Sequence, residues 1–318
     1  VAARKGIPVD CVRAALRGYS IRFEYDRPPN TMLLMPEWET WKNIPLTAAQ
    51  EAALDEYLAR REKVPFEYLG TEWQAHIDDE QEVRRHAGLP SQVAGRIFGM
   101  FPNVSFDAGL TSTTVAFSDA NQWIAETISF IANRPEHHLL IKVHPAECRR
   151  NAQDPLIPYL RRRFPSLPAN VHLIPPDAGI TARAVTRLSD WALVYTSTVS
   201  VEAAATGKPV MLVGGGWNAG RGFTHDMRSA GEYFERLSGI CSGQWNPVHP
   251  LELARRYAFA LFFRSNIPIN HYTVLDLNVT SLNIDSLADL APGRDPSMDI
   301  ICRGVLLDEP MEYPFNGK

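Results

Sequence analysis

From Arg96 onward, short apolar runs alternate with amphipathic segments, and this alternation restricts the fold more than any other feature of the chain. The apolar runs predict strands, and apolar residues at helical spacing between them predict helices. The expected strands are 97–102, 138–143, 171–174, 191–195 and 209–213, and the expected helices are 119–133, 156–164, 181–188 and 199–206. Strands that alternate with helices form a doubly wound, mostly parallel sheet. The sequence therefore predicts an α/β fold.

Outside this region, local signals predict three more helices. Segment 46–61 has apolar residues at helical spacing, with Thr47 as a plausible N-cap and Gln50 three residues later. That spacing is typical of a capping box, in which the two side chains bond to each other's backbone N–H groups. Two further helices are expected at 251–264 and near 284–290.

The length favours two domains, because 318 residues exceed the usual size of a single one. We expect a first, partial domain with a linker in 1–95 and an α/β ligand-binding domain in 96–250. Residues 251–318 are expected to form C-terminal helices and a tail that pack back on the first domain. The sequence begins at Val1 without Met, so we expect the beginning of the first domain to be missing.

The charge balance argues against a nucleic-acid-binding protein. The formal net charge is −4 and the pI is near 6.2, whereas a general nucleic-acid binder needs a basic excess. A local basic cluster at Arg161, Arg162 and Arg163 has two interpretations, a solvated helix face or a patch that docks on a membrane.

The cysteines and the apolar stretches favour a cytoplasmic protein. The four cysteines, Cys11, Cys148, Cys241 and Cys302, lie far apart and form no CxxC pair. Neither a structural zinc site nor a disulfide framework is therefore expected. Apolar stretches such as 257–263 are too short to cross a bilayer, and no signal peptide is visible.

Polar residues and glycines follow four of the predicted strands, where parallel sheets bind their ligands. Asn103 and Asp107 come after the first strand, where a helix cap explains them as well as a ligand contact does. After the second strand, His144 and Pro145 are well placed to bind a phosphate, and a capped strand end is the alternative. His137 and His138 lie at the other end of that strand, so we expect no metal cluster.

The segment after strand 191–195 combines hydroxyl groups with a helix start. Thr196, Ser197 and Thr198 lead directly into helix 199–206, and such an N-terminus offers backbone N–H groups and the positive end of the helix dipole to an anion. A simple N-cap is the alternative. Glu202 lies one turn after Thr198, where it could bind ribose hydroxyls or remain solvated.

The segment 214–224 is rich in glycine, which permits positive φ and a close approach of the backbone to a ligand. It is not a phosphate-binding GxxxxGK[ST] loop, because no Lys-Ser/Thr pair follows. A flexible linker is the alternative, but a position directly after a sheet strand favours binding.

In this order, the motifs resemble the capsule polysaccharide synthesis proteins, which include the transferases of Kdo (3-deoxy-manno-octulosonate). The similarity covers roughly residues 95–240. It is carried by Phe101-Pro-Asn103-Val-x-x-Asp107, Lys142-Val-His144-Pro145-Ala-Glu147, Tyr195-Thr196-Ser197-Thr198-Val-x-Val-Glu202-Ala-Ala, Gly207-Lys-Pro-Val210 and Gly220-x-Gly-Phe-Thr224. The resemblance implies a GT-B glycosyltransferase with two Rossmann-like domains. Residues 1–95 would then be the acceptor-side domain and 96–250 the nucleotide-sugar-binding domain.

The resemblance also implies roles for individual residues. His144 and Pro145 would contact the donor phosphate, Ser197 and Thr198 would cap the phosphate-binding helix, and Glu202 would lie near the sugar of the nucleotide. We expect His144 and Asp107 to be catalytic. The expected donor-binding residues are Asn103, Lys142, Pro145, Glu147, Thr196, Ser197, Thr198, Glu202, Gly215, Gly216 and Arg221. Because the family needs no metal to bind its donor, no metal and no cofactor are expected.

The expected function is transfer of a sugar from a CMP-Kdo-like or UDP-sugar donor to a surface polysaccharide or glycolipid acceptor. The expected place is the cytoplasm, with contact to the inner face of the membrane left open. Three alternatives remain: an enzyme similar to UDP-N-acetylglucosamine 2-epimerase, a teichoic-acid-type glycerophosphotransferase, and a non-catalytic subunit of polysaccharide assembly.

Overall fold

The computed structural model describes most of the chain, and it divides into two compact units. Residues 1–72 together with 256–318 form unit 1, and residues 73–255 form unit 2. The described residues are 10–14, 16–17, 20–25, 38–63, 77–104, 115–148, 155–216, 218–269, 271–275 and 278–315.

Unit 2 is built on a six-stranded sheet in which every pair of neighbours is parallel. Its strands are β3 (Ile97–Phe101), β4 (His138–Lys142), β5 (Val171–Ile174), β6 (Trp191–Val194), β7 (Val210–Leu212) and β8 (His225–Asp226). Their order is β5-β4-β3-β6-β7-β8. Counted from the first strand, this is the 3-2-1-4-5-6 order of doubly wound nucleotide-binding sheets. The predicted α/β fold with a parallel sheet is confirmed, and β8 is a strand that the sequence did not predict.

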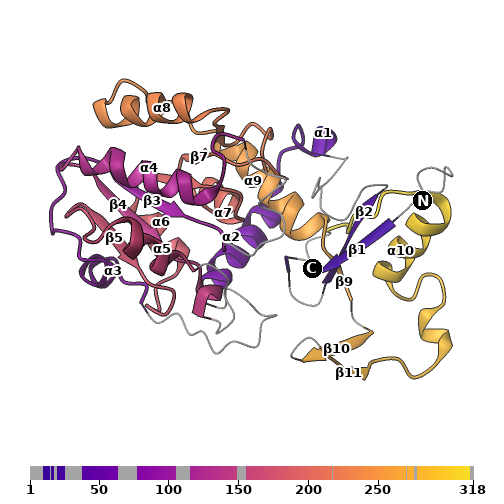
Figure 1. The fold of residues 1–318 in the computed structure, drawn as a ribbon. Coiled ribbons are helices and arrows are strands. Elements are labelled where there is room, and N and C mark those ends of the chain that lie inside the picture. The colour runs from indigo at the N-terminus through magenta and orange to yellow at the C-terminus, as the bar shows by residue number, and fades with distance from the viewer. Residues whose placement is uncertain are drawn as a thin grey trace. The chain divides into compact units, whose positions relative to one another are not determined.

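Helices cover both faces of this sheet, as Figure 1 shows. On one face, apolar residues of α4 (Ala120–Ala132), α5 (Leu156–Arg163) and α8 (Ala230–Ser242) form a core with the strands. Trp123, Leu160 and Tyr233 are among the fully or nearly fully buried side chains of this core. On the other face, α6 (Ala182–Leu188) packs between α3 (Glu80–His86) and α7 (Val199–Ala205). A short 3₁₀ helix, η3 (Pro145–Cys148), follows β4.

Side-chain caps fix where several of these helices begin. Asp119 accepts a hydrogen bond from Gln122 N at the start of α4, and Thr181 and Ser229 do the same at the starts of α6 and α8. Each cap satisfies a backbone N–H group that has no partner within the helix. The predicted helix 119–133 is thereby confirmed almost to the residue, whereas α3 and α8 were not predicted.

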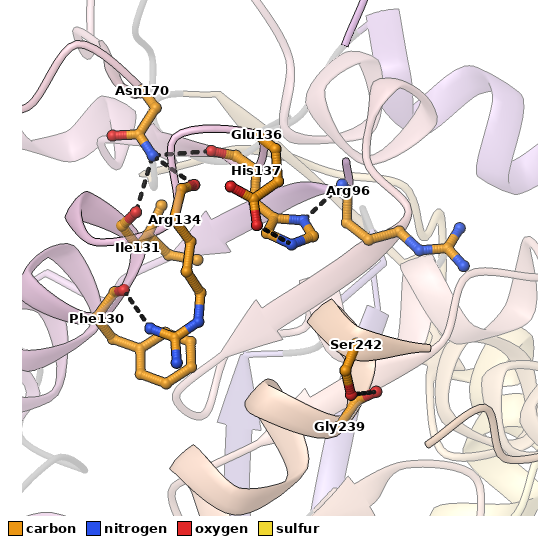
Figure 2. A network of polar contacts seen from close by, with 9 residues as sticks. All are labelled: Arg96, Phe130, Ile131, Arg134, Glu136, His137, Asn170, Gly239 and Ser242. Carbon is orange, nitrogen blue, oxygen red and sulfur yellow. Dashed lines mark hydrogen bonds and ion pairs between the residues drawn. The ribbon is translucent and has the colours of Figure 1, made fainter. Parts of the chain in front are cut away.

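A buried asparagine joins three chain segments at the amino edge of the sheet, where the strands begin (Figure 2). Asn170 Nδ2 donates to the carbonyl oxygens of Ile131, Arg134 and His137, at 2.8, 3.0 and 2.9 Å. His137 extends this network to the residue before β3, because its Nδ1 accepts a hydrogen bond of 2.8 Å from Arg96 N. These contacts tie the end of α4 and the start of β4 to the residue that precedes β5.

Unit 1 contains antiparallel strands. β1 (Asp10–Ala14), β2 (Ser20–Tyr25) and β9 (Ile267–Pro268) form one sheet, and β10 (Tyr272–Leu275) pairs with β11 (Asn278–Leu282). Among its described residues, unit 1 has no parallel sheet that would correspond to the expected second Rossmann-like domain.

The helices of unit 1 include α1 (Trp38–Trp41), α2 (Ala48–Lys63), η5 (Leu287–Leu290) and α10 (Pro296–Leu307). The sequence predicted helices at 46–61, 251–264 and 284–290. The predicted capping box is confirmed before α2, because Thr47 N donates to Gln50 Oε1 and Gln50 N donates to Thr47 Oγ1. The predicted helix 251–264 is α9 (Leu251–Phe259), which ends in a π-helical turn, Ala260–Arg264. Within the described ranges, no helix combines the length and the apolar character that crossing a bilayer requires.

We predict that Asn170→Ala lowers the free energy of unfolding by about 2–3 kcal/mol, because three backbone carbonyls lose a buried donor. Urea denaturation followed by circular dichroism measures this loss. Asn133→Ala is the matched control, since Asn133 Nδ2 bonds only to Ser129 O at an exposed position of the same helix end. It should cost less than about 0.5 kcal/mol. Equal losses in the two variants would contradict the role given to Asn170.

Candidate functional site

The register of the central strands brings the predicted loops to one edge. Met100 of β3 pairs with Ile141 of β4, and Phe101 pairs with Val194 of β6. Asn103 follows Phe101 by two residues, as Thr196 follows Val194. Likewise, Asn103 follows Met100 by three residues, as His144 follows Ile141. The loops after β3, β4 and β6 therefore start at the same level of the sheet.

A hydrogen bond joins two of these loops at the centre of the sheet. Thr196 N donates to Asn103 Oδ1 at 3.2 Å. The strands that carry them, β3 and β6, are the neighbours at which the chain order reverses, because β4 and β5 extend to one side and β7 and β8 to the other. In open α/β sheets, ligands bind in the crevice at this topological switch point.

The ring of His144 is oriented by its own loop. Ala146 N donates to His144 Nδ1 at 3.1 Å, within the turn that begins η3. A ring nitrogen that accepts a hydrogen bond carries no proton, so a neutral His144 has its proton on Nε2. The sequence prediction that His144 lies at the carboxyl end of β4 holds in the structure, and its side chain is half-buried there.

Lys142 is turned toward the backbone of two neighbouring loops. Its side chain is almost fully buried, and Nζ donates to the carbonyl oxygens of Val143 and Pro175 at 3.0 and 3.3 Å. Burial lowers the pKa of Lys142 to about 8, and the electrostatic interactions of its ammonium group with Cys148 and Asp177 oppose this shift in part. These contacts hold together the chain segments that follow β4 and β5.

Glu147 also bonds to backbone. Its Oε2 accepts a hydrogen bond of 2.9 Å from Leu156 N, at the first residue of α5. The N-cap residue of that helix, Pro155, supplies no side-chain cap, so Glu147 serves in its place. Burial raises the pKa of this carboxyl group, and the hydrogen bond from Leu156 opposes the rise.

The hydroxyl groups before α7 differ in what they do. Ser197 Oγ accepts a hydrogen bond of 3.3 Å from Val199 N, so Ser197 caps the chain entering the helix. Thr198 is the N-cap residue by position, but its side chain makes no cap hydrogen bond. Glu202 lies on the same helix, half-buried, and Glu202 N bonds to Thr198 O at 3.1 Å.

The glycine-rich segment continues from β7 and is folded back on the sheet. Gly214 N bonds to Tyr195 O at 3.0 Å, which places the segment beside the end of β6. Gly216 has a φ of 121° and Gly220 a φ of 71°, values that only glycine adopts without strain. Asp226 of β8 closes the segment, because its carboxylate accepts hydrogen bonds from Gly220 N and from the hydroxyl of Thr224, both at 2.6 Å.

One polar side chain within this segment is completely buried. Asn218 has no exposed surface, and its Nδ2 lies within hydrogen-bonding distance of Ser200 Oγ and of Ser197 O. Its Oδ1 is buried without a hydrogen-bond partner in the part of the chain that the structure describes. An acceptor in this state costs about 1–3 kcal/mol relative to one that is hydrogen-bonded.

Some predicted residues cannot be placed, and three important ones were not predicted. Asp107 lies outside the described residues, whereas Gly215, Gly216 and Arg221 lie half-buried in the glycine-rich segment. The unpredicted residues that organise the site are Asn218, Ser200 and Asp226. Only the Thr224-x-Asp226 spacing offered a signal for one of them, as a polar pair at the end of a glycine-rich loop.

Metal ligation has no candidate in the described ranges, where no group of three or more His, Cys, Asp or Glu side chains is placed to hold an ion.

Comparison with known proteins gives remote similarities only. No family model and no curated protein matches the chain. Among solved structures, the β-Kdo 2,7 transferase of Thermosulfurimonas dismutans KpsC is 15% identical, over 87% of this chain and 75% of that one, with a TM-score of 0.47. The β-Kdo 2,4 transferase of the same KpsC is 14% identical, over 80% of this chain and 73% of that one, with a TM-score of 0.46.

A third similar structure is that of a putative UDP-N-acetylglucosamine 2-epimerase from Listeria monocytogenes. It is 12% identical, over 83% of this chain and 60% of that one, with a TM-score of 0.31. At such identities and TM-scores, similarity alone assigns no activity to this chain.

We predict that Lys142→Met changes how stability depends on alkaline pH. The folded protein holds the pKa of Lys142 at about 8, below the unfolded value of 10.5, so between these pH values the unfolded chain binds more protons. The free energy of unfolding of the wild type, compared with that of the variant, must therefore rise as the pH increases from 8 to 10.5, by up to about 3 kcal/mol. Chemical denaturation of wild type and variant at pH 7.5, 9.0 and 10.5 measures the difference. Parallel profiles would show that the ammonium group is not held as described.

Proposed function

We propose that this chain is a GT-B-type glycosyltransferase that binds an activated nucleotide sugar at the carboxyl edge of the sheet in unit 2. The observation that carries the proposal is the Thr196–Asn103 hydrogen bond at the switch point of a 3-2-1-4-5-6 sheet. Ligands of such sheets bind at this point. The motif order through residues 95–240 supports the same family, that of the capsule polysaccharide synthesis proteins.

The donor would be bound by groups from three loops. His144 would donate from Nε2 to a phosphate oxygen, because Nδ1 accepts the hydrogen bond from Ala146. Thr196, Ser197, Thr198 and the glycines 215 and 216 would add hydroxyl and backbone donors, with Arg221 as a positive charge and Glu202 as a partner for the ribose. Asn103 would position the backbone at Thr196.

Two residues have a different role in this proposal. Lys142 bonds to the carbonyls of Val143 and Pro175, and Glu147 caps α5. We therefore assign both to holding the loops in place, with Pro145 fixing the turn between them. Asp107 is retained as a candidate catalytic contact on sequence grounds alone.

Catalysis would come from stabilising the leaving nucleotide. Negative charge develops on the phosphate as the bond to the sugar breaks, and donors already in position bind that charge better than they bind the ground state. The sugar would pass to a surface polysaccharide or glycolipid acceptor on the cytoplasmic side of the membrane. Following the family resemblance, donor binding would need no metal.

The first prediction is that a nucleotide raises the thermal stability of the protein. CMP, CDP, UDP and GDP are screened by thermal shift, since a ligand at 100 times its Kd adds about 2.7 kcal/mol. Stabilisation by CMP favours a Kdo-like donor, and stabilisation by UDP favours a hexose transferase or an epimerase. Glycerophosphotransfer from CDP-glycerol also releases CMP, so it is favoured over Kdo transfer where CDP stabilises the protein more than CMP does. If none of the four nucleotides raises the melting temperature of the folded protein, the proposal is contradicted and a non-catalytic subunit is favoured.

The second prediction concerns His144→Ala. Loss of one donor to the developing charge should lower kcat about 100- to 1000-fold, which corresponds to about 2.7–4 kcal/mol in the barrier. Release of the nucleotide from the donor that the screen identifies is the measurement. The matched control is His86→Ala, because His86 is exposed on α3 and its Nδ1 lies 2.9 Å from Glu82 O. Unchanged turnover in His144→Ala would show that His144 has no part in the reaction.

A further inference from the structure

Asn218 links the glycine-rich segment to the helix beside it. Its Nδ2 is within hydrogen-bonding distance of Ser200 Oγ and lies 3.4 Å from Ser197 O. Ser200 in turn donates from Oγ to Ser197 O at 2.9 Å. The three residues thus form one cluster at the start of α7, in which Asn218 and Ser200 are fully buried and Ser197 is one of the hydroxyl residues assigned to donor binding.

This contact fixes one part of the segment, and a second contact fixes the other. Asp226 accepts hydrogen bonds from Gly220 N and from the Thr224 hydroxyl. Gly220 and Gly222 lie between these two anchors and Gly216 lies just before the first, and all three have positive φ, so the backbone itself offers little resistance to rearrangement. Side-chain contacts therefore help to hold its position, and Asn218 supplies one of them, to Ser200 of α7.

The state of the Asn218 amide points to a role beyond filling space. Its Oδ1 is buried without a hydrogen-bond partner among the described residues, and the side chain has no exposed surface. An apolar side chain of similar size would fill the same volume without an unsatisfied acceptor. Folded proteins usually satisfy their buried polar groups, and exceptions occur at functional sites. The donor half of the amide is the part that the structure uses.

We propose that Asn218 is a positioning residue, whose amide anchors the glycine-rich segment 214–224 to Ser197 and Ser200 so that the segment can hold the phosphates of the donor nucleotide. The proposal rests on the function proposed above and assigns to that site a residue that the sequence did not indicate.

The test compares two buried asparagines at opposite edges of the same sheet. Asn218→Ala should raise the Kd for CMP or UDP, whichever binds the wild type, by tenfold or more. Amide hydrogen exchange in residues 218–226 should become at least tenfold faster in the same variant. Asn170 lies at the amino edge, where its side chain bonds to the backbone of Ile131, Arg134 and His137. Asn170→Ala should therefore leave both the Kd and the exchange rate within twofold of wild type.

Ser200→Ala provides a second route to the same contact. It removes the hydroxyl beside Asn218 Nδ2 and very little volume, so it tests the anchor even if Asn218→Ala folds poorly. It should raise the Kd severalfold. The double variant should bind within about twofold of Asn218→Ala alone, because residues that act through one contact are not additive.

The outcomes separate this proposal from the proposed function. If wild type binds CMP or UDP, and Asn218→Ala and Ser200→Ala bind it equally well with unchanged exchange in 218–226, the anchoring role is overturned. If wild type binds none of CMP, CDP, UDP and GDP, the proposed function is overturned, and the role of Asn218 in holding a donor falls with it. Weakened binding together with faster exchange in 218–226 supports the proposal.

Discussion

Strand β3 is hydrogen-bonded on both sides by parallel strands, β4 and β6, and this double pairing sets the relative positions of the loops after these three strands. All five residues of β3 are buried. Gly99 at its centre is required by packing, because a Cβ atom there would lie 2.5 Å from Ser189 Oγ, just beyond the end of α6. A shift of β3 by one residue would exchange the two faces of the strand and separate Asn103 from Thr196.

Buried polar groups at the edges of this sheet mostly bind backbone. Asn170 joins α4, β4 and β5 at the amino edge, and Lys142 joins the ends of β4 and β5 at the carboxyl edge. Such groups lower the energy only when their partners are close and well aligned, since an unpaired buried donor or acceptor is costly. The consequence is a division of roles. Lys142 and Glu147 hold loops through hydrogen bonds to backbone atoms, whereas the ring of His144 lies half-buried at the carboxyl edge of the sheet.

The sequence predicted the parallel sheet well because most of its strands are apolar runs, of which β3, β6 and β7 are buried at every residue. Strand 171–174 was predicted with its observed bounds. Helix α8 was missed although Ser229 caps it and Gly243 ends it, because the glycines and the mixed composition around it weaken the periodicity. Strand β8 has only two residues, too few for any period. In unit 1, the pairing of β2 with β9 joins residues that are remote in sequence, such as Ile21 and Ile267, and local patterns carry no record of such partners.

For the site, the sequence located the loops but not the contacts within them. His144 and Thr196 were found because they follow strands, and position after a strand is a local property. Asn218 and Asp226 were not found, since their importance comes from hydrogen bonds to Ser200 and Gly220 that exist only once the loop is folded. The same limit applies to Lys142 and Glu147, which the sequence predicted as ligands of a nucleotide, because their hydrogen bonds to backbone atoms of other loops left no sign in the sequence.

Unit 2 occupies one uninterrupted stretch, Trp73–Arg255, whereas unit 1 is assembled from the chain on both sides of it. A ribosome therefore delivers all of unit 2 before it delivers β9, the strand that pairs with β2. The parallel sheet can be complete while the earlier residues of unit 1 still wait for their partners. During that interval the edge of β2 that later pairs with β9 is open to unintended pairing. The order of synthesis thus lets unit 2 fold first and leaves unit 1 dependent on protection until translation ends.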